Sequence, residues 1–236
     1  GSVKSGCLHD SALPHVGQIR GVPIDFETPP PKTSADFFLP QEACALLRSR
    51  PPQLHKHSAG VVHLWAGSPE YPGAASLSAS GALRSGAGYV RLFADRPIPE
   101  SLSPSLPELL VHSFDCGEAP KIEEFMKGAS SLVIGPGLSA TPVLETFLAE
   151  LLPQTKIPIV LDAGALDVVA RHPEILSSAS GPILLTPHTG ELARLLGTPI
   201  HNRAESARTW LERFPATILI AKGAHTLIAT KDSALS

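Results

Sequence analysis

Clustered positive charge is absent from this sequence. Its 19 lysine and arginine residues are scattered among 22 acidic residues, and the formal net charge of the 236-residue chain is −3. Nucleic-acid-binding domains gather their cations on one face, where they follow the phosphate backbone. We therefore expect no nucleic-acid partner.

Cysteine is scarce as well. Cys7, Cys44 and Cys116 are odd in number, far apart and without C-x-x-C spacing, which argues against both a disulfide framework and a zinc knuckle. Three free thiols are typical of a reducing compartment, so we expect a cytoplasmic protein.

Long apolar runs are also missing. A membrane-spanning helix needs about 20 consecutive apolar residues, and no segment of this sequence approaches that length. We expect no membrane partner. With 43% hydrophobic residues, the chain has ample apolar material for a sizeable globular core.

The first 50 residues differ from the rest. They are loosely patterned and contain Pro29-Pro30-Pro31, which is typical of a tail and linker. Only one short strand is predicted there, over residues 18–24.

The remaining residues alternate between short apolar runs and helical patterns. Strands are predicted over residues 61–66, 89–93, 131–134, 157–161, 183–185, 217–220 and 225–229. Helices are predicted over residues 73–85, 141–152, 163–170, 190–196 and 204–214, and a polar connector follows residue 93. This pattern predicts an α/β fold with a mainly parallel sheet that helices cover on both faces.

Polar motifs follow the predicted strands directly. They are Gly67-Ser68, Gly135-Pro136-Gly137, Asp162-Ala163-Gly164, Thr186-Pro187-His188 and Lys222-Gly223. Right-handed crossovers place the carboxyl ends of parallel strands at one edge of the sheet, where ligands bind. We therefore expect these motifs to meet in one crevice.

Two of these motifs have a structural and a functional interpretation. Gly135-Pro136-Gly137 either forms a tight turn that requires positive φ or directs backbone amides at an anion. Asp162 either caps the next helix or faces the crevice.

The break between the strand at 183–185 and the next helix has two interpretations. In one, Thr186 or Thr189 caps the helix and Glu191 lies in its first turn, where the helix dipole favours an acid. In the other, the imidazole of His188 lies over the crevice and donates to a ligand.

Lys222-Gly223 is followed by His225 and Thr226. A cation, a glycine and a hydroxyl within five residues suit a nucleotide phosphate, although Lys-Gly also occurs in surface turns. Neither the P-loop pattern G-x-x-x-x-G-K-[S/T] nor G-x-G-x-x-G after the first strand is present.

Taken together, the motifs resemble those of the ADP- or ATP-dependent NAD(P)H-hydrate dehydratases. The resemblance begins at His55-Lys56, continues through the run AGSPEYPGAASLSASGALRSGAGYVRL, and includes IGPGL, VLDAGAL, LTPHTGEL and KGAHTLIA in that order. It covers about residues 54–230.

The amino-terminal region is similar to a different domain. Residues 1–30, with GQIRGVPID, resemble the end of the NAD(P)H-hydrate epimerase domain that precedes the dehydratase in bifunctional members. We therefore interpret residues 1–50 as the tail of an epimerase-like domain with its linker, and residues 51–236 as a dehydratase domain.

The resemblance implies a three-layer, ribokinase-like α/β fold and a repair reaction. The hydrated nicotinamide ring of NADHX or NADPHX would lose its added hydroxyl at the expense of ADP or ATP, which regenerates NADH or NADPH. Phosphorylation of that hydroxyl would convert a poor leaving group into phosphate. The family also implies Mg²⁺ as a cofactor and assembly into a homo-oligomer.

Residue roles follow from the matching motifs. Ala74, Gly137 and His188 would contact the hydrated dinucleotide. The phosphate and AMP portion of the nucleotide would bind the segment formed by Lys222, Gly223, Ala224, His225 and Thr226. Asp162 and Glu191 would line the same crevice through Mg²⁺ or water.

The sequence departs from the family in three places. His57 and Ser139 stand where the family has glycine. The family's GGxGD-like segment carries the aspartate that is expected to act as base, and the sequence ends at Ser236 without it. We therefore expect a C-terminally incomplete domain that is inactive alone, while its full-length parent is active. The alternatives are a ribokinase-like kinase of a small molecule and a non-catalytic nucleotide-binding remnant.

Overall fold

The computed structural model describes residue 53, residues 55–96, residue 98, residues 106–115, residues 117–232 and the backbone of residues 234–235. The predicted tail and linker over residues 1–50, with its strand at 18–24, lie outside these residues. In the described part of the chain, nine strands form one sheet in the order β3-β2-β1-β4-β5-β6-β7-β8-β9. Strands β1 to β7 pair in parallel, whereas β8 and β9 are antiparallel. The predicted mainly parallel α/β sheet is confirmed.

The strands are β1 (Val61–Trp65), β2 (Tyr89–Asp95), β3 (Leu110–Phe114), β4 (Ser131–Ile134), β5 (Ile159–Leu161), β6 (Ile183–Leu185), β7 (Thr217–Ala221), β8 (Leu227–Ala229) and β9 (Ala234–Leu235). The α-helices are α2 (Pro72–Arg84), α4 (Ile122–Met126), α5 (Pro142–Gln154), α6 (Gly164–Arg171), α7 (Thr189–Leu196) and α8 (Arg203–Arg213). Two short 3₁₀ helices, η3 (His57–Ala59) and η4 (Pro173–Ser178), complete the elements.

Most predicted elements occur where they were expected, but the predicted polar connector was wrong. It contains strand β3 and helix α4. Strand β3 lies at the edge of the sheet, and three of its five residues are exposed, so it lacks the continuous apolar run of a buried strand. Helix α4 has five residues, which is too short for a helical period to be recognised.

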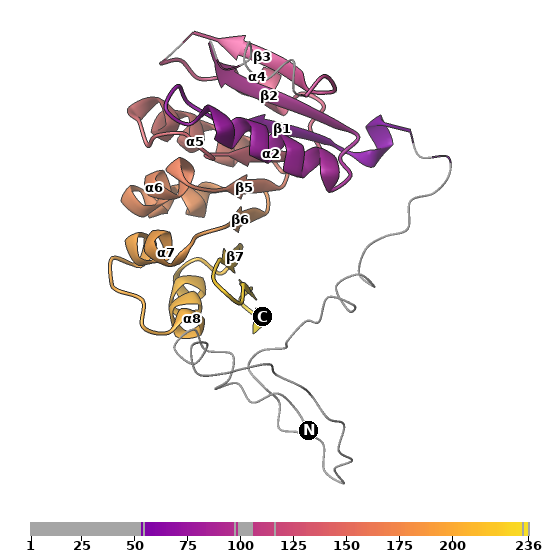
Figure 1. Cartoon of the computed structure of the whole chain (residues 1–236). Coiled ribbons are helices and arrows are strands. Elements are labelled where there is room, and N and C mark those ends of the chain that lie inside the picture. The colour runs from indigo at the N-terminus through magenta and orange to yellow at the C-terminus, as the bar shows by residue number, and fades with distance from the viewer. Residues whose placement is uncertain are drawn as a thin grey trace.

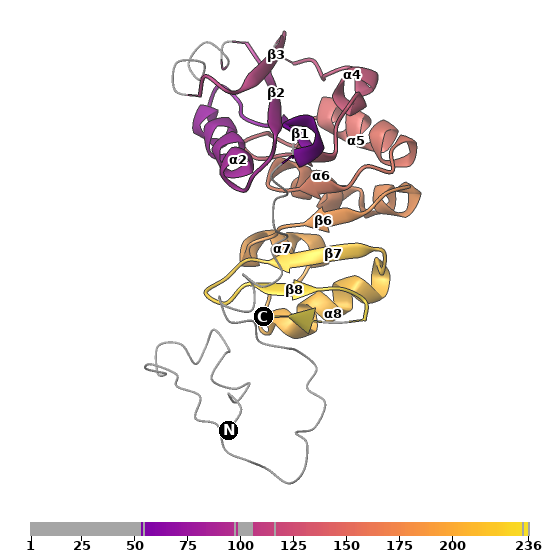
Figure 2. The ribbon, with the colours of Figure 1, turned by 90° about the vertical axis from the view of Figure 1, so that its right-hand side faces the viewer.

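Helices cover the two faces of the sheet unequally. Helices α4 to α8 pack on one face, where Leu132, Leu161 and Leu185 belong to one apolar core. On the other face, α2 packs on β1 and β2 through Ala75 and Ala79. Figure 1 shows α5 to α8 along one side of the sheet, and Figure 2 shows β6 to β8 in front of α7 and α8.

The prediction of helices on both faces therefore holds for only part of the described sheet. Beyond β4, the second face carries apolar side chains that no described helix covers, and Ile228 is 42% exposed. The reason is topological, because successive right-handed crossovers in one direction place their helices on the same face. The chain runs in that direction from β4 to β7.

The order of the strands reverses beside β1. The chain passes from β1 to β2 and β3 at one edge, and then returns to form β4 on the other side of β1. Such a switch point is the usual ligand site of an open α/β sheet, at the loops that follow the two strands, here β1 and β4. The predicted motifs Gly67-Ser68 and Gly135-Pro136-Gly137 are these two loops.

One titratable side chain is completely buried in the sheet. His63 on β1 packs near the rings of Phe93 and Phe125, and its Nδ1 lies 2.7 Å from the carbonyl oxygen of Phe125. Burial lowers the pKa of His63, and the nearby charge of Arg91 lowers it further, while the bond to Phe125 opposes both effects. The folded protein therefore resists protonation of this ring.

We expect this histidine to weaken the fold in acid. The unfolded chain takes up a proton near pH 6.5 that the folded chain binds only at lower pH, so the stabilisation is complete above pH 6.5 and is lost as the pH falls through the lowered pKa. In the variant His63→Gln, an amide can still donate to Phe125 but does not titrate. Urea unfolding between pH 7.5 and 5 should show a smaller loss of free energy for this variant, and equal losses would contradict the assignment.

Candidate functional site

The two loops at the switch point are bound to each other. The N–H of Gly67 donates to the carbonyl oxygen of Pro136 at 2.8 Å. Gly137 has φ +72, and a Cβ at this position would lie 2.6 Å from the Cβ of Ala74 in the first turn of α2. The structure thus brings Ala74 and Gly137, two of the predicted substrate residues, into contact at the switch point.

Gly135 connects this switch point to the next strand. Its φ is +117, and a Cβ there would overlap the carbonyl oxygen of Asp162 and approach the backbone nitrogen of Ala165 to 2.9 Å. Positive φ and close backbone packing therefore explain both glycines of the Gly-Pro-Gly turn. The turn interpretation is correct, and it places the loops after β4 and β5 side by side.

Three charged side chains meet beyond this turn. Nζ of Lys222, which follows β7, lies 2.9 Å from Oδ1 of Asp162 and 3.8 Å from Oε2 of Glu191. The side chains of Asp162 and Lys222 are 27% and 42% exposed, whereas that of Glu191 is only 7% exposed. The N–H of Lys222 also donates to the carbonyl oxygen of Pro187. One cation is thus held between two carboxylates at the ends of three neighbouring strands.

Asp162 does not cap the following helix. The N-cap position of α6 is Ala163, and no side chain accepts a hydrogen bond from the first turn. The capping interpretation of Asp162 was therefore wrong. Its carboxylate instead accepts a hydrogen bond from Nζ of Lys222.

The residue that caps α7 is His188 itself. Its Nδ1 accepts hydrogen bonds from the N–H groups of Gly190 (2.9 Å) and Glu191 (3.3 Å), and Oε2 of Glu191 accepts one from the N–H of His188 (2.8 Å). These reciprocal bonds form a capping box. The prediction of Thr186 or Thr189 as the cap was wrong, since Thr189 is the first residue of α7 and Thr186 bonds to Leu161.

The cap determines which nitrogen of His188 is available to a ligand. Because Nδ1 accepts two hydrogen bonds, the proton of the neutral ring is on Nε2. The side chain is 56% exposed, and Nε2 lies 3.6 Å from Oε2 of Glu191. The cap therefore occupies Nδ1 and leaves Nε2–H as the ring's available donor.

The predicted nucleotide segment, residues 222–226, forms the turn between β7 and β8. The guanidinium of Arg203, the first residue of α8, lies against this turn. Its Nη1 donates to the carbonyl oxygen of Ala221 at 3.1 Å, and a Cβ on Gly223 would overlap it. Sequence reasoning missed Arg203, because the sole local signal is a cation at the start of a helix.

A metal ion would have few protein ligands in this crevice. Among the described residues, no group of three or more His, Cys, Asp or Glu side chains could hold one. The carboxylates of Asp162 and Glu191 do converge on Lys222. One or two carboxylates together with phosphate oxygens are the usual ligands of Mg²⁺ in nucleotide sites. The donor set therefore fits Mg²⁺ that arrives with a nucleotide.

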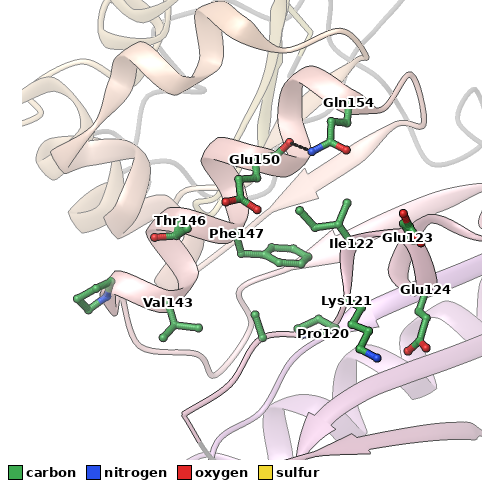
Figure 3. A pocket seen from close by; sticks show the side chains of 12 residues that line it. Pro120, Lys121, Ile122, Glu123, Glu124, Val143, Thr146, Phe147, Glu150 and Gln154 are labelled. Atoms are coloured by element: carbon green, nitrogen blue, oxygen red, sulfur yellow. Dashed lines mark hydrogen bonds between the residues drawn. The ribbon is translucent and has the colours of Figure 1, made fainter.

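A separate hollow lies between α4 and α5, away from the predicted site residues. Its volume is about 910 Å³, and none of the motif residues lines it. Phe147 and Ile122 contribute apolar surface, and Glu123, Glu124 and Glu150 contribute carboxylates (Figure 3). The converging charges and the strand ends are at the other location, which we take as the functional site.

Ala163 has a strained backbone at this site. Its φ is +46, and it is the one non-glycine residue with positive φ among those described. Such a conformation costs about 1–3 kcal/mol, whereas the greater freedom of glycine in the unfolded chain costs about 0.4–1 kcal/mol. Ala163→Gly should therefore stabilise the fold by roughly 1 kcal/mol in urea unfolding. A loss of stability would show that the methyl group contributes more than the strain.

This mainly parallel sheet, with glycine turns and with a lysine paired to two carboxylates at its carboxyl edge, has the ribokinase-like fold. A solved ribokinase-like superfamily protein from Enterococcus faecalis has the same fold, with a TM-score of 0.73 over 91% of this chain and 73% of the other, at 21% identity. The family model of NAD(P)H-hydrate dehydratase matches residues 62–236. The chain belongs to this family.

Individual relatives agree with this assignment. A bifunctional NAD(P)H-hydrate repair enzyme from Moorella thermoacetica is 37% identical over 190 residues, which are 75% of this chain and 36% of that protein. The ADP-dependent (S)-NAD(P)H-hydrate dehydratase of Bacillus subtilis is 33% identical over 83% of this chain and 70% of its own length. The chain thus spans about a third of the first relative.

A relative has been crystallised in the presence of a nucleotide. The ADP/ATP-dependent NAD(P)H-hydrate dehydratase from Bacillus subtilis, co-crystallised with ATP and Mg²⁺, matches with a TM-score of 0.72 and 30% identity. The match covers 86% of this chain and 73% of the other. In the present structure, no described helix is long and apolar enough to cross a membrane.

Proposed function

We propose that this chain provides the substrate cradle and the phosphate-binding side of an enzyme that dehydrates NADHX or NADPHX with ADP or ATP. The observation that carries the proposal is the placement of Lys222 between Asp162 and Glu191, next to the capped imidazole of His188. The family match over residues 62–236 supports the assignment of substrate and nucleotide.

The proposed chemistry follows from the poor leaving group of the substrate. Hydroxide leaves a carbon centre poorly, so the ring hydroxyl first gives its proton to a base as its oxygen forms a bond to the terminal phosphorus of the nucleotide. The bond from that phosphorus to the nucleotide's bridging oxygen breaks in the same step. The carbon–oxygen bond then breaks, phosphate departs with the bonding electrons, and loss of a ring proton restores the dihydronicotinamide. The first step is phosphoryl transfer, which depends on positioning and charge stabilisation.

The residues of this chain perform the binding part of that reaction. Ala74 and Gly137 form a surface without long side chains, which allows the dinucleotide to approach the backbone. Nε2–H of His188 donates a hydrogen bond to the substrate, and Lys222 offsets phosphate charge. Asp162 and Glu191 would hold Mg²⁺, which would offset the charge of the transferring phosphoryl group.

Binding and turnover together test the proposal. Isothermal titration of ADP and ATP into the 236-residue chain should show binding of at least one nucleotide, and NADPH should raise the melting temperature. The product of the encoding gene should convert NADHX to NADH only when ADP or ATP is present. Failure of both nucleotides to bind, or phosphorylation of a small alcohol instead of NADHX, would contradict the proposal.

We further propose a cytoplasmic homo-oligomer, in a polypeptide that also carries an epimerase domain. Support for the oligomer comes from α2, which has no charged residue before its last position and presents Leu77 with 76% exposure. Packing of this face against a second copy would bury no charged side chain. Light scattering coupled to gel filtration would contradict the oligomer if it gave the mass of one chain.

A further inference from the structure

We propose that Tyr71 is a binding residue of the dinucleotide site, and that its ring stacks on the adenine of NADHX or NADPHX. The inference deepens the proposed function and rests on it. It assigns a role to a side chain beside Ala74 and Gly137, which are predicted to contact the dinucleotide and have no ring of their own.

Tyr71 lies at the switch point of the sheet, between the end of β1 and the start of α2. A Cβ placed on Gly137 would lie 3.2 Å from the Cβ of Tyr71 and 2.6 Å from the Cβ of Ala74. A Cβ on Gly73, the second residue of α2, would meet no neighbouring element within 4 Å. The side chain of Tyr71 therefore starts beside the predicted substrate residues, at a part of the surface that is open.

Tyr71 is the one exposed tryptophan, tyrosine or phenylalanine in the described part of the chain. It is 63% exposed, whereas the other described residues of these three types are buried or half-buried. Packing in the core therefore does not account for this ring. The face of an aromatic ring at a ligand site offers a planar base a surface on which to stack.

Helix capping does not account for the ring either. Tyr71 occupies the N-cap position of α2, but its side chain makes no capping hydrogen bond, unlike the serine, threonine, aspartate or asparagine that is usual there. Its backbone is nevertheless held. The N–H donates to the carbonyl oxygen of Ser68 at 3.0 Å, and the carbonyl oxygen accepts from the N–H of Ala74 at 3.2 Å. A tyrosine on a fixed backbone loses little rotational freedom when a ligand stacks on it.

The position of Lys222 indicates which ring of the dinucleotide reaches Tyr71. In the proposed reaction, the hydroxyl of the nicotinamide ring meets the terminal phosphate of the nucleotide near Lys222, after β7. Four strand spacings of about 4.8 Å separate β1 from β7, or roughly 19 Å in all, and Figure 1 shows β5 and β6 between them. With the nicotinamide at the end of β7, the adenine is the ring that lies at the end of β1.

The first experiment uses fluorine NMR of the chain labelled with fluorotyrosine. The sequence has two tyrosines, Tyr71 and Tyr89, and Tyr71→Phe assigns their signals by removing one of them. NADPH should shift the signal of Tyr71, because a stacked base changes the field at the ring. The signal of Tyr89 should stay unchanged, since this residue begins β2 at the amino edge of the sheet and packs against the ring of His57.

Nuclear Overhauser effects identify the ring that stacks. In the complex with NADPH, the ring protons of Tyr71 should show these effects to the adenine protons and none to the nicotinamide protons. Effects to the nicotinamide protons would overturn the assignment. In a sample that also contains ADP, effects to the adenine of ADP instead of that of NADPH would overturn it as well.

Affinities separate stacking from simple apolar contact. In isothermal titration with NADPH, Tyr71→Leu keeps an apolar side chain without a ring and should bind at least about fivefold more weakly than wild type. Y71F keeps the ring and should bind within about twofold of wild type. Leu110→Ala shortens an exposed apolar side chain on the edge strand β3 and is the control that should leave binding unchanged. Thermal melting of each variant without ligand checks that the fold is retained.

The outcomes distinguish the inference from the proposed function. If wild type binds NADPH and Y71L binds it equally well, Tyr71 does not stack on the dinucleotide and the inference is overturned, while the proposed function stands. If wild type binds neither NADPH nor ADP nor ATP, the proposed function itself falls. Y71L should keep its affinity for ADP and ATP, since their site is at the end of β7. Equal losses for ADP and NADPH would mean that Tyr71 acts only through the structure of the site, which would also overturn the inference.

Discussion

Alanine at position 135 is expected to destabilise the fold by roughly 3–5 kcal/mol, the largest effect of any single methyl group at the site. Positive φ contributes about 1–3 kcal/mol. The new Cβ would also overlap the carbonyl oxygen of Asp162 and approach the backbone nitrogen of Ala165. Both neighbours are backbone atoms, so the loops after β4 and β5 have to separate. Urea unfolding measures the free-energy change.

Gly128→Ala is the matched control for Gly135→Ala. Gly128 also has positive φ, at +79, but a Cβ there would meet no atom within 4 Å. The free energy of unfolding of G128A should therefore fall only by the cost of the backbone conformation, about 1–2 kcal/mol. Equal losses at the two positions would show that the close packing of the Gly-Pro-Gly turn against Asp162 contributes nothing.

Replacement of Lys222 by glutamine should weaken binding of ADP and ATP by roughly 100-fold or more. Removing one member of a closely paired set of charges usually costs several kcal/mol, partly because the other charges remain without a partner. Here the carboxylates of Asp162 and the nearly buried Glu191 would face the incoming phosphates without Lys222 between them. Isothermal titration at constant ionic strength measures the loss.

Two further variants show whether this loss has the expected cause. Lys156→Gln removes an exposed lysine that precedes β5, at the opposite edge of the sheet, and should leave nucleotide binding unchanged. In titrations without Mg²⁺, which Asp162 would otherwise hold, adding Asp162→Asn to K222Q should recover part of the binding, because one repelling carboxylate becomes neutral. An unchanged affinity in K222Q alone would mean that the lysine pairs with the carboxylates for structural reasons only.

The centre of the fold was predictable from sequence, and its edges were not. Strands β4 and β6 were predicted at their observed bounds, since a buried parallel strand appears as an uninterrupted apolar run. Strand β3 lies at the edge of the sheet, and none of its five residues is buried. It forms by pairing with β2. Pairing between two separate segments leaves no signal in the local sequence pattern of either one.

The site was predictable to the level of motifs and not to the level of contacts. Position after a strand was enough to select Asp162, His188 and Lys222. The cap by His188 was not foreseen, because serine, threonine, aspartate and asparagine are the usual N-cap residues. Arg203 was missed for a different reason, since its contact with Gly223 joins a helix start to a turn after the following strand.

The capping box of α7 also affects how tightly His188 can hold a ligand. A free surface imidazole loses rotational freedom when a ligand orders it, and this loss of entropy subtracts from affinity. The ring of His188 is already fixed by two backbone N–H groups, so its freedom was lost when the chain folded. Recognition through Nε2 would therefore be preorganised, and a substrate that required the ring to turn would have to break the hydrogen bonds that cap the helix.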